Sequence, residues 1–154
     1  MSVKHDSFTV ERDYDAPPSR VWRAWSDPGE KAAWFGGPEE WGPAEYELDF
    51  RVGGREVSRG GPPDGPSFTY DATYRDIVPG ERFVYAYDMY SDETRISVSL
   101  GTLELAPTGS GTRLTYTEQA AMLDGLDTIE ERRRGTIELL DALGRALAEE
   151  RATA

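Results

Sequence analysis

The stretch from Phe8 to Gly36 constrains the fold of this chain more than any other segment. Residues 8–14 alternate apolar and polar side chains, which is typical of a strand with one buried face. Residues 15–19, Asp-Ala-Pro-Pro-Ser, end this strand and open a helix, because proline suits a first helical turn that needs no amide donor. Trp22 and Trp25 share one face of that helix. A second short helix is predicted from Asp27-Pro28 and ends in Trp34-Phe35-Gly36, so the chain begins with one strand and two short helices.

The middle of the chain is rich in strands. Alternation of apolar and polar residues predicts six further strands, at 45–50, 55–59, 68–77, 82–89, 94–105 and 112–120. The third and fourth of these are joined by Val78-Pro79-Gly80-Glu81, a Pro-Gly turn. In the fifth, Ile96, Val98 and Leu100 share one face, and the apolar phase then changes, which predicts a bulge or bend near Gly101.

The chain ends in a long predicted helix. Asp127 followed by Glu130 resembles a capping box. The triplet 132–134, Arg-Arg-Arg, follows two glutamates and is interpreted as a solvated helical turn rather than a nucleic-acid patch. An apolar stripe then faces inward, formed by Thr136, Leu139, Leu140, Leu143 and Leu147. An antiparallel sheet covered on one face by this helix buries every apolar face in the sequence, so the fold class is α+β.

Composition excludes several functions. The 154 residues fit one domain. Cysteine is absent, and the single histidine, His5, excludes a histidine triad or a multi-histidine metal site, so we predict no metal and no cofactor. The net charge of −12 disfavours binding to nucleic acid or an anionic membrane. With no apolar signal segment at its start, the protein is predicted to be cytoplasmic and away from membranes.

Five spaced motifs resemble a known family. They are Asp15-Ala16-Pro17-Pro18-Ser19-Arg20-Val21-Trp22, Trp34-Phe35-Gly36, Arg51-Val52-Gly53-Gly54, residues 74–82 (Tyr-Arg-Asp-Ile-Val-Pro-Gly-Glu-Arg) and Leu139-Leu140-Asp141-Ala142-Leu143. Together with the order of elements, they resemble the heat-shock-protein-90 ATPase activator homologue-like family. That family belongs to the START-like (SRPBCC) superfamily, with polyketide cyclases and birch-pollen-allergen proteins. A shared fold of this kind does not by itself assign a function.

The resemblance implies a helix-grip fold, in which a curved antiparallel sheet of about six or seven strands wraps the C-terminal helix. It covers residues 7–150 as one START-like domain, with flexible termini expected at 1–6 and 151–154. It also implies a cavity for an apolar ligand between sheet and helix. Many relatives carry a Gly-Trp pair early in the last helix, whereas this chain has Gly135-Thr136, which would enlarge the cavity or change its mouth.

Aromatic side chains in matching phases are the sharpest local signal. Tyrosine combines a large apolar ring with a hydroxyl, which suits a mostly apolar ligand with few polar groups. The alternative is that these rings fill the core. The residues predicted to contact a ligand are Trp34, Phe50, Phe68, Tyr70, Tyr85, Tyr87, Val98, Tyr116, Glu118, Leu139 and Leu143.

Glu118 shares the phase of Tyr116, so its carboxylate is expected to point inward, where it needs a partner or a proton. It would then orient a ligand or act as a general base with Tyr85 or Tyr116; an arginine partner or a solvent-exposed strand end would remove that role. The favoured function is binding of a hydrophobic or aromatic small molecule. The alternatives are a polyketide cyclase- or hydratase-like enzyme and a co-chaperone-like interaction domain. A homodimer is compatible with so small a domain, but no interface is visible in the sequence.

Overall fold

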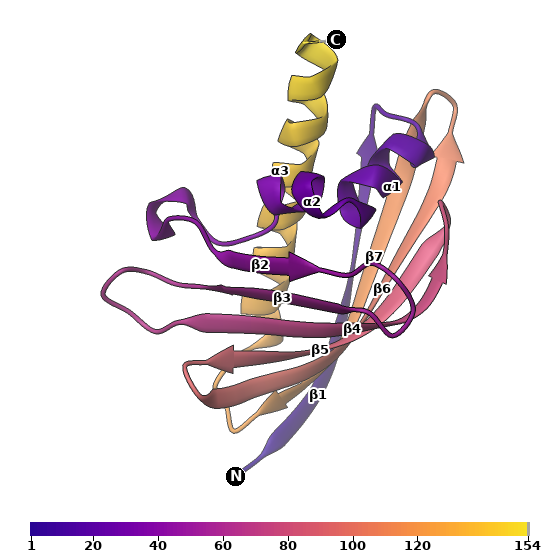
Figure 1. Cartoon of the computed structure of the whole chain (residues 1–154). Helices are drawn as coiled ribbons and strands as arrows, with labels where there is room; N and C mark the ends of the chain where they lie inside the picture. Colours follow the sequence, from indigo (N-terminus) through magenta and orange to yellow (C-terminus); the bar gives the residue numbers. More distant parts are fainter. Residues whose placement is uncertain (154) are drawn as a thin grey trace.

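Seven antiparallel strands form one curved sheet around a long C-terminal helix in the computed structural model (Figure 1), which describes the backbone of residues 1–153 and the side chains of residues 1–149. The strand order across the sheet is β1-β7-β6-β5-β4-β3-β2. The strands are β1 (Val3–Tyr14), β2 (Glu45–Leu48), β3 (Arg55–Gly60), β4 (Phe68–Val78), β5 (Arg82–Ser91), β6 (Thr94–Thr108) and β7 (Gly111–Leu123). The helices are α1 (Pro18–Ser26), α2 (Pro28–Trp34), the short 3-10 helix η1 (Glu39–Trp41) and α3 (Ile129–Thr153). The predicted α+β helix-grip fold is confirmed.

β1 is longer than its alternation predicts. It begins at Val3 and pairs with β7 along its whole length, from Val3 opposite Leu123 to Tyr14 opposite Thr112. His5 is therefore a strand residue opposite Ala121. Backbone pairing extends the strand beyond the part where apolar residues alternate. At the other end of the chain, α3 is described as far as Thr153, and Ala154 lies outside the described residues.

The two short helices begin where the sequence predicts. Pro18 opens α1, and Pro28 opens α2 after Asp27, whose side chain accepts a hydrogen bond from the backbone N–H of Glu30 at 2.9 Å. Proline in the first turn lacks one of the N–H groups that a helix start leaves unpaired, and the aspartate cap accepts a hydrogen bond from another. Trp25 of α1 packs edge-on against Trp34 of α2, with ring centroids 4.7 Å apart. The two helices thereby place a wall of indole rings beside the sheet.

α3 lies inside the concave face of the sheet (Figure 1). Leu140, Leu143 and Leu147 are buried in one hydrophobic core with the inward side chains of the strands. The Tyr14 hydroxyl of β1 donates to the backbone oxygen of Leu140 at 2.7 Å and so ties this helix to the sheet edge. Among the described residues, no helix combines the length and the apolarity that a membrane crossing requires.

The predicted cap of α3 is wrong by one residue. Thr128, not Asp127, accepts the hydrogen bond from the N–H of a first-turn residue, Glu131, at 3.1 Å. The Asp127 carboxylate instead accepts from the backbone N–H of Thr128 and from Arg132. The sequence offers both Asp-x-x-Glu and Thr-x-x-Glu at this point, and the choice follows from the ion pair that Asp127 makes.

The expected phase of β6 is wrong for Val98 and Leu100. The irregularity in its pairing with β5 falls at Ile96, between the Met89–Ser97 and Tyr90–Arg95 pairs, and not near Gly101. Val98 and Leu100 therefore lie on the outer face of the sheet, where Val98 is 39% exposed, while Ser97 and Ser99 point inward and are buried. The two serines have buried polar partners, so the strand breaks the rule that apolar residues mark the inner face.

Candidate functional site

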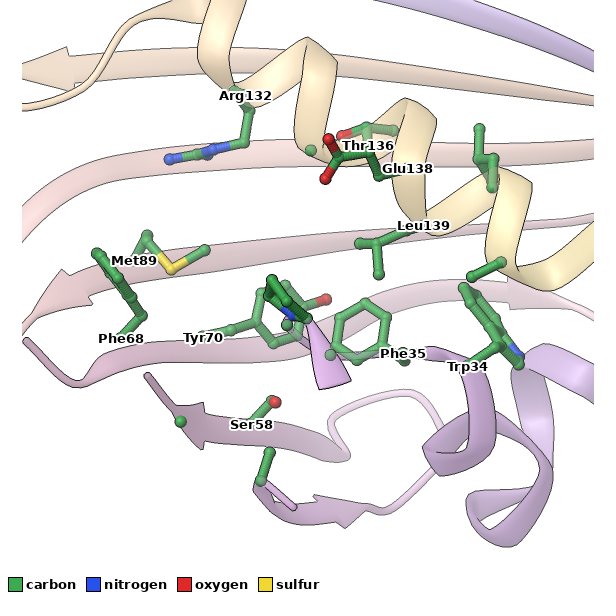
Figure 2. Close-up of a pocket in the computed structure, with 18 of the residues that line it drawn as sticks. Trp34, Phe35, Ser58, Phe68, Tyr70, Met89, Arg132, Thr136, Glu138 and Leu139 are labelled. Atoms are coloured by element: carbon green, nitrogen blue, oxygen red, sulfur yellow. The ribbon is translucent and has the colours of Figure 1, made fainter. Parts of the chain in front are cut away.

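A cavity of about 850 Å³ lies between the inner face of the sheet, α3 and the segment that follows α2. Figure 2 shows Arg132, Thr136 and Leu139 on the helix side, with Phe68, Tyr70 and Met89 on the strands opposite. A cavity of this size falls within the range of small-molecule sites. Rings make up much of its wall: Trp25, Trp34, Phe35, Trp41, Phe68, Tyr70, Tyr85, Tyr87 and Tyr116.

Most of the residues that the sequence predicts as ligand contacts lie on this wall. They are Trp34, Phe68, Tyr70, Tyr85, Tyr87, Tyr116, Glu118 and Leu139. They come from α2, three strands (β4, β5 and β7) and α3, and the matching phases of the strands bring them together. Whether they contact a ligand stays a prediction.

The other three predicted contacts lie elsewhere. Val98 points to the outer face because of the register of β6. Phe50 packs between Trp22, Tyr74 and Phe83, with ring centroids 4.9–5.7 Å away. Leu143 is fully buried in the core. The apolar stripe of α3 thus divides: Leu139 faces the cavity, whereas Leu143 holds the helix to the sheet.

Glu118 is buried at 1% exposure and bonded to four side chains. Its Oε1 accepts from the Tyr116 hydroxyl at 2.8 Å. Its Oε2 accepts from Tyr87 at 2.7 Å, Ser99 at 3.0 Å and Arg132 Nη1 at 2.9 Å. The inward orientation of Glu118 is as expected, and its partner is an arginine, one of the two alternatives to a functional role.

The interpretation of the arginine triplet 132–134 as a solvated turn is wrong for Arg132. Its side chain is 9% exposed and bridges Glu118 and Asp127, with a further contact from Nη2 to the Ser97 hydroxyl at 2.6 Å. Burial alone would lower the pKa of Arg132, but Tyr87, Glu118 and Asp127 together raise it above its ordinary value. Arg132 therefore stays charged and fixes the start of α3 to the sheet. The flanking acidic residues conceal this role in the sequence.

The hydroxyls of Tyr85 and Tyr116 meet at 2.6 Å, beside Glu118. Gly101 makes this approach feasible, because a Cβ atom there would lie 2.7 Å from Tyr85 Cζ and 2.8 Å from the Tyr116 oxygen. Glycine in a strand interior often marks such a close approach. The residue that the sequence marks as a bend is thus a packing position beneath two tyrosines.

Substitution of alanine for Gly101 is expected to lower the free energy of unfolding by about 1–3 kcal/mol, because one ring must shift to admit the methyl group. Gly135→Ala is the matched control: a Cβ atom at Gly135 meets nothing within 4 Å, and alanine in a helix should stabilise by about 0.5–1 kcal/mol. Urea denaturation of both variants measures the difference. Equal stability of Gly101→Ala and the wild type would contradict the close packing of the two rings.

A second buried ion pair lies behind the cavity wall, and the sequence analysis missed it. Lys31 of α2 and Glu56 of β3 are 1% and 0% exposed, with Nζ 2.6 Å from Oε2. Three tyrosine hydroxyls donate to the same carboxylate, from Tyr46, from Tyr70 at 3.1 Å and from Tyr74 at 2.9 Å. Since Tyr70 also lines the cavity, it connects this pair to the site.

The surroundings of Lys31 are aromatic. Its Nζ lies 4.3 Å from the centre of the Phe35 ring and 5.1 Å from that of Trp25. Burial lowers the pKa of Lys31, and the facing Glu56 carboxylate opposes that shift. The sequence gives little sign that Glu56 is buried. Its neighbour Val57 is the apolar residue, which predicts that the opposite face of the strand is the buried one. Because lysine is seldom buried, the burial of Lys31 could not be predicted from its position in α2.

Neither buried carboxylate has the surroundings of a metal ligand. Within the described part of the chain, no three histidine, cysteine, aspartate or glutamate side chains are placed to hold a metal ion together. Both carboxylates are instead paired with a cationic side chain and with tyrosine hydroxyls, as buried polar groups generally are. The arrangement suits recognition of an organic molecule by shape and a few hydrogen bonds.

Comparison with known proteins gives a family and several solved structures. The sequence model of the family "Activator of Hsp90 ATPase homolog 1-like protein" matches residues 15–149. A Rhizobium leguminosarum protein of known structure is 43% identical, with a TM-score of 0.92 over 96% of this chain and 97% of its own. A Rhizobium loti protein is 45% identical, with a TM-score of 0.87 over 95% of this chain and 99% of its own.

A more distant structure, from Chromobacterium violaceum, is 27% identical, with a TM-score of 0.75 over 90% of this chain and 94% of its own. No curated protein matches. The match of the family model spans most of the chain, and the solved relatives share its length and topology. The chain therefore belongs to the activator of Hsp90 ATPase homolog 1-like family, within the START-like superfamily.

Proposed function

We propose that this protein binds a hydrophobic or aromatic small molecule in the cavity between the sheet and α3. The observation that carries the proposal is a cavity of about 850 Å³ whose wall is largely aromatic. Ligand sites of this kind combine apolar walls with a few convergent polar groups. Here the polar groups are the hydroxyls of Tyr87 and Tyr116, which are held in place by Glu118, and Arg132 in turn holds the Glu118 carboxylate.

The geometry favours binding over the cyclase- or hydratase-like alternative. A general base needs a lone pair within reach of the proton that it removes. Oε2 of Glu118 already accepts three hydrogen bonds, one of them from a guanidinium, and Oε1 accepts a fourth from Tyr116. Tyr85 and Tyr116 are bonded to each other, and burial raises the pKa of both hydroxyls. These groups are better placed to orient a ligand than to exchange protons with it.

Thr136→Trp tests the proposal directly, because Thr136 projects from α3 on the cavity wall (Figure 2) and an indole there would fill part of the space. Native mass spectrometry of freshly purified wild type is expected to show a stoichiometric organic adduct, and Thr136→Trp is expected to lose it. Where the adduct has been removed, adding back the released compound at about 100 times its Kd should raise the Tm of the wild type by about 5–10 °C.

Arg133→Trp is the matched control, since it adds the same indole to an exposed position of α3 outside the cavity wall. It should keep the adduct. Loss of the adduct in both variants would indicate a general effect on the fold. If the wild type carries no adduct and no hydrophobic compound of a diverse panel raises its Tm, the proposal is wrong.

A further inference from the structure

The hydrogen atoms of the cavity floor are already assigned by its hydrogen bonds. The Glu118 carboxylate, paired with Arg132, only accepts, so the Tyr116 hydroxyl must donate its hydrogen to Oε1. Tyr116 then has no hydrogen left for its 2.6 Å contact with Tyr85, and Tyr85 must be the donor there. Tyr85 is a residue of the cavity wall, and its oxygen therefore keeps a lone pair for a ligand while its hydrogen is committed to Tyr116.

The neighbouring hydroxyls also donate their hydrogens to groups of the protein. Tyr87 donates to Glu118 Oε2 and accepts from Arg132 Nη1. Ser99 also donates to Oε2, and Tyr70 donates to Glu56. To bond an acceptor on a ligand, any of these hydroxyls would have to withdraw its hydrogen from a buried carboxylate or from the hydroxyl that it supports. The floor around Glu118 thus offers acceptors to a ligand.

The rest of the cavity wall carries more negative than positive charge. The carboxylates of Glu39, Asp127, Glu131 and Glu138 line the cavity. Against these stand Arg145 and Arg132, and Arg132 already bridges two carboxylates. An anion that enters the cavity meets an excess of negative charge, in a chain whose net charge is −12.

One buried donor on the wall is different. Trp25 Nε1 has no hydrogen-bond partner among the described residues. Its indole packs on Trp34 and on Phe83, four residues along β5 from Tyr87. This nitrogen has essentially no exposed surface, so it lies within the wall and not on the surface that faces the cavity. The hydroxyls of Ser58 and Thr136, which also line the cavity, can rotate to donate or to accept and so favour neither.

We propose that the cavity selects aromatic molecules that carry a neutral or cationic hydrogen-bond donor, such as a phenol or a protonated amine, for the Tyr85 oxygen, and rejects carboxylates. This inference rests on the proposed binding function and names the chemical class of its ligand. The acceptor floor and the acidic wall are independent observations that favour the same class.

Four compounds that share the naphthalene ring system test the inference: naphthalene, 2-naphthol, 2-methoxynaphthalene and 2-naphthoate. Each is titrated into the wild type by isothermal titration calorimetry at pH 7. 2-Naphthol is expected to bind about 10-fold or more tightly than 2-methoxynaphthalene, which cannot donate. 2-Naphthoate is expected to bind at least about 10-fold more weakly than naphthalene itself. If 2-naphthoate binds as well as 2-naphthol while naphthalene binds, only the inference about ligand class fails. If none of the four binds, the premise of an aromatic-binding cavity fails with it.

Tyr85→Phe removes the acceptor oxygen and keeps the ring. The preference for 2-naphthol over 2-methoxynaphthalene should fall to about threefold or less. Tyr90→Phe makes the same change on β5 at a tyrosine outside the cavity wall and should keep the full preference. A preference that survives in Tyr85→Phe would overturn the assignment of the acceptor to Tyr85.

Discussion

Replacement of Lys31 by methionine is expected to lower the free energy of unfolding by about 3–5 kcal/mol. The substitution keeps most of the apolar stem among the rings of Trp25 and Phe35 but removes the charge that faces Glu56. A carboxylate with no exposed surface would then remain without its ammonium partner. Glu56→Gln should cost a similar amount, since it leaves a charged lysine in an aromatic enclosure.

The double variant Lys31→Met/Glu56→Gln is expected to be more stable than either single variant. It removes both charges, and the glutamine oxygen can still accept from the tyrosine hydroxyls that surround it. A double-mutant cycle by urea denaturation measures the coupling energy between the two residues. Strict additivity would contradict the view that the two buried charges depend on each other.

Arg55 and Asp71 provide the control on neighbouring strands. They form a two-pronged ion pair with distances of 2.8 and 2.9 Å, but their side chains are 66% and 30% exposed. Exposed pairs contribute about 1 kcal/mol or less. A cycle with Arg55→Met and Asp71→Asn should therefore give a much smaller coupling energy. The contrast isolates burial, rather than short distance, as the cause.

The fold could be predicted because its apolar patterns are local. β1, β4, β5 and β7 alternate in phase with their buried faces, and the prolines at residues 17 and 18 mark the start of α1. β6 is the exception. Its inner face carries Ser97 and Ser99, which serve Arg132 and Glu118, so the apolar residues Val98 and Leu100 are left on the outside. Leu103 and Leu105 make only the second half of the inner face apolar, so the pattern of hydrophobicity cannot reveal which residues of the first half point inward.

The site was predictable only as far as its aromatic side chains. Tyr70, Tyr85, Tyr87 and Tyr116 converge because each lies in the apolar phase of its strand. The charges that hold them could not be found in this way. Lys31 and Glu56 are 25 residues apart in the sequence and are brought together only by the fold. The partner of Glu118 is Arg132, which lies in a stretch that the sequence predicts to be solvated. Pairing of buried charges is a three-dimensional property, with no local period.

The buried carboxylates of Glu56 and Glu118 also raise the pKa of the tyrosine hydroxyls near them. Seven of the eight tyrosines have a raised pKa: Tyr14, Tyr46, Tyr70, Tyr74, Tyr85, Tyr87 and Tyr116. Burial is the largest cause in each case, and for most of them the charge of Glu56 or Glu118 adds to it. The folded protein therefore holds these protons after the unfolded chain, whose tyrosines have a pKa near 10.0, has lost them.

The expected result is a sharp loss of stability above pH 10. A raised folded-state pKa contributes stability that is fully present below the unfolded-state value and is lost as the pH rises beyond it. Each tyrosine lowers the free energy of unfolding by about 1.4 kcal/mol per pH unit there. Five of the seven are at most 8% exposed. Together these five reduce the stability by about 7 kcal/mol per pH unit, which is comparable to the whole stability of a domain.

Unfolding is therefore expected between about pH 11 and pH 12, with most tyrosines ionising in that single step. Tyrosinate absorbance and circular dichroism, followed together through an alkaline titration, should change at the same pH. The same titration in concentrated urea is the control, and it should show all tyrosines ionising near their ordinary pKa. Tyrosinate absorbance that develops gradually around pH 10 while the circular dichroism is unchanged would show that the hydroxyls reach solvent in the folded state. Such a result would contradict the closed network around Glu56 and Glu118, because those hydroxyls could not then be committed donors to the two carboxylates.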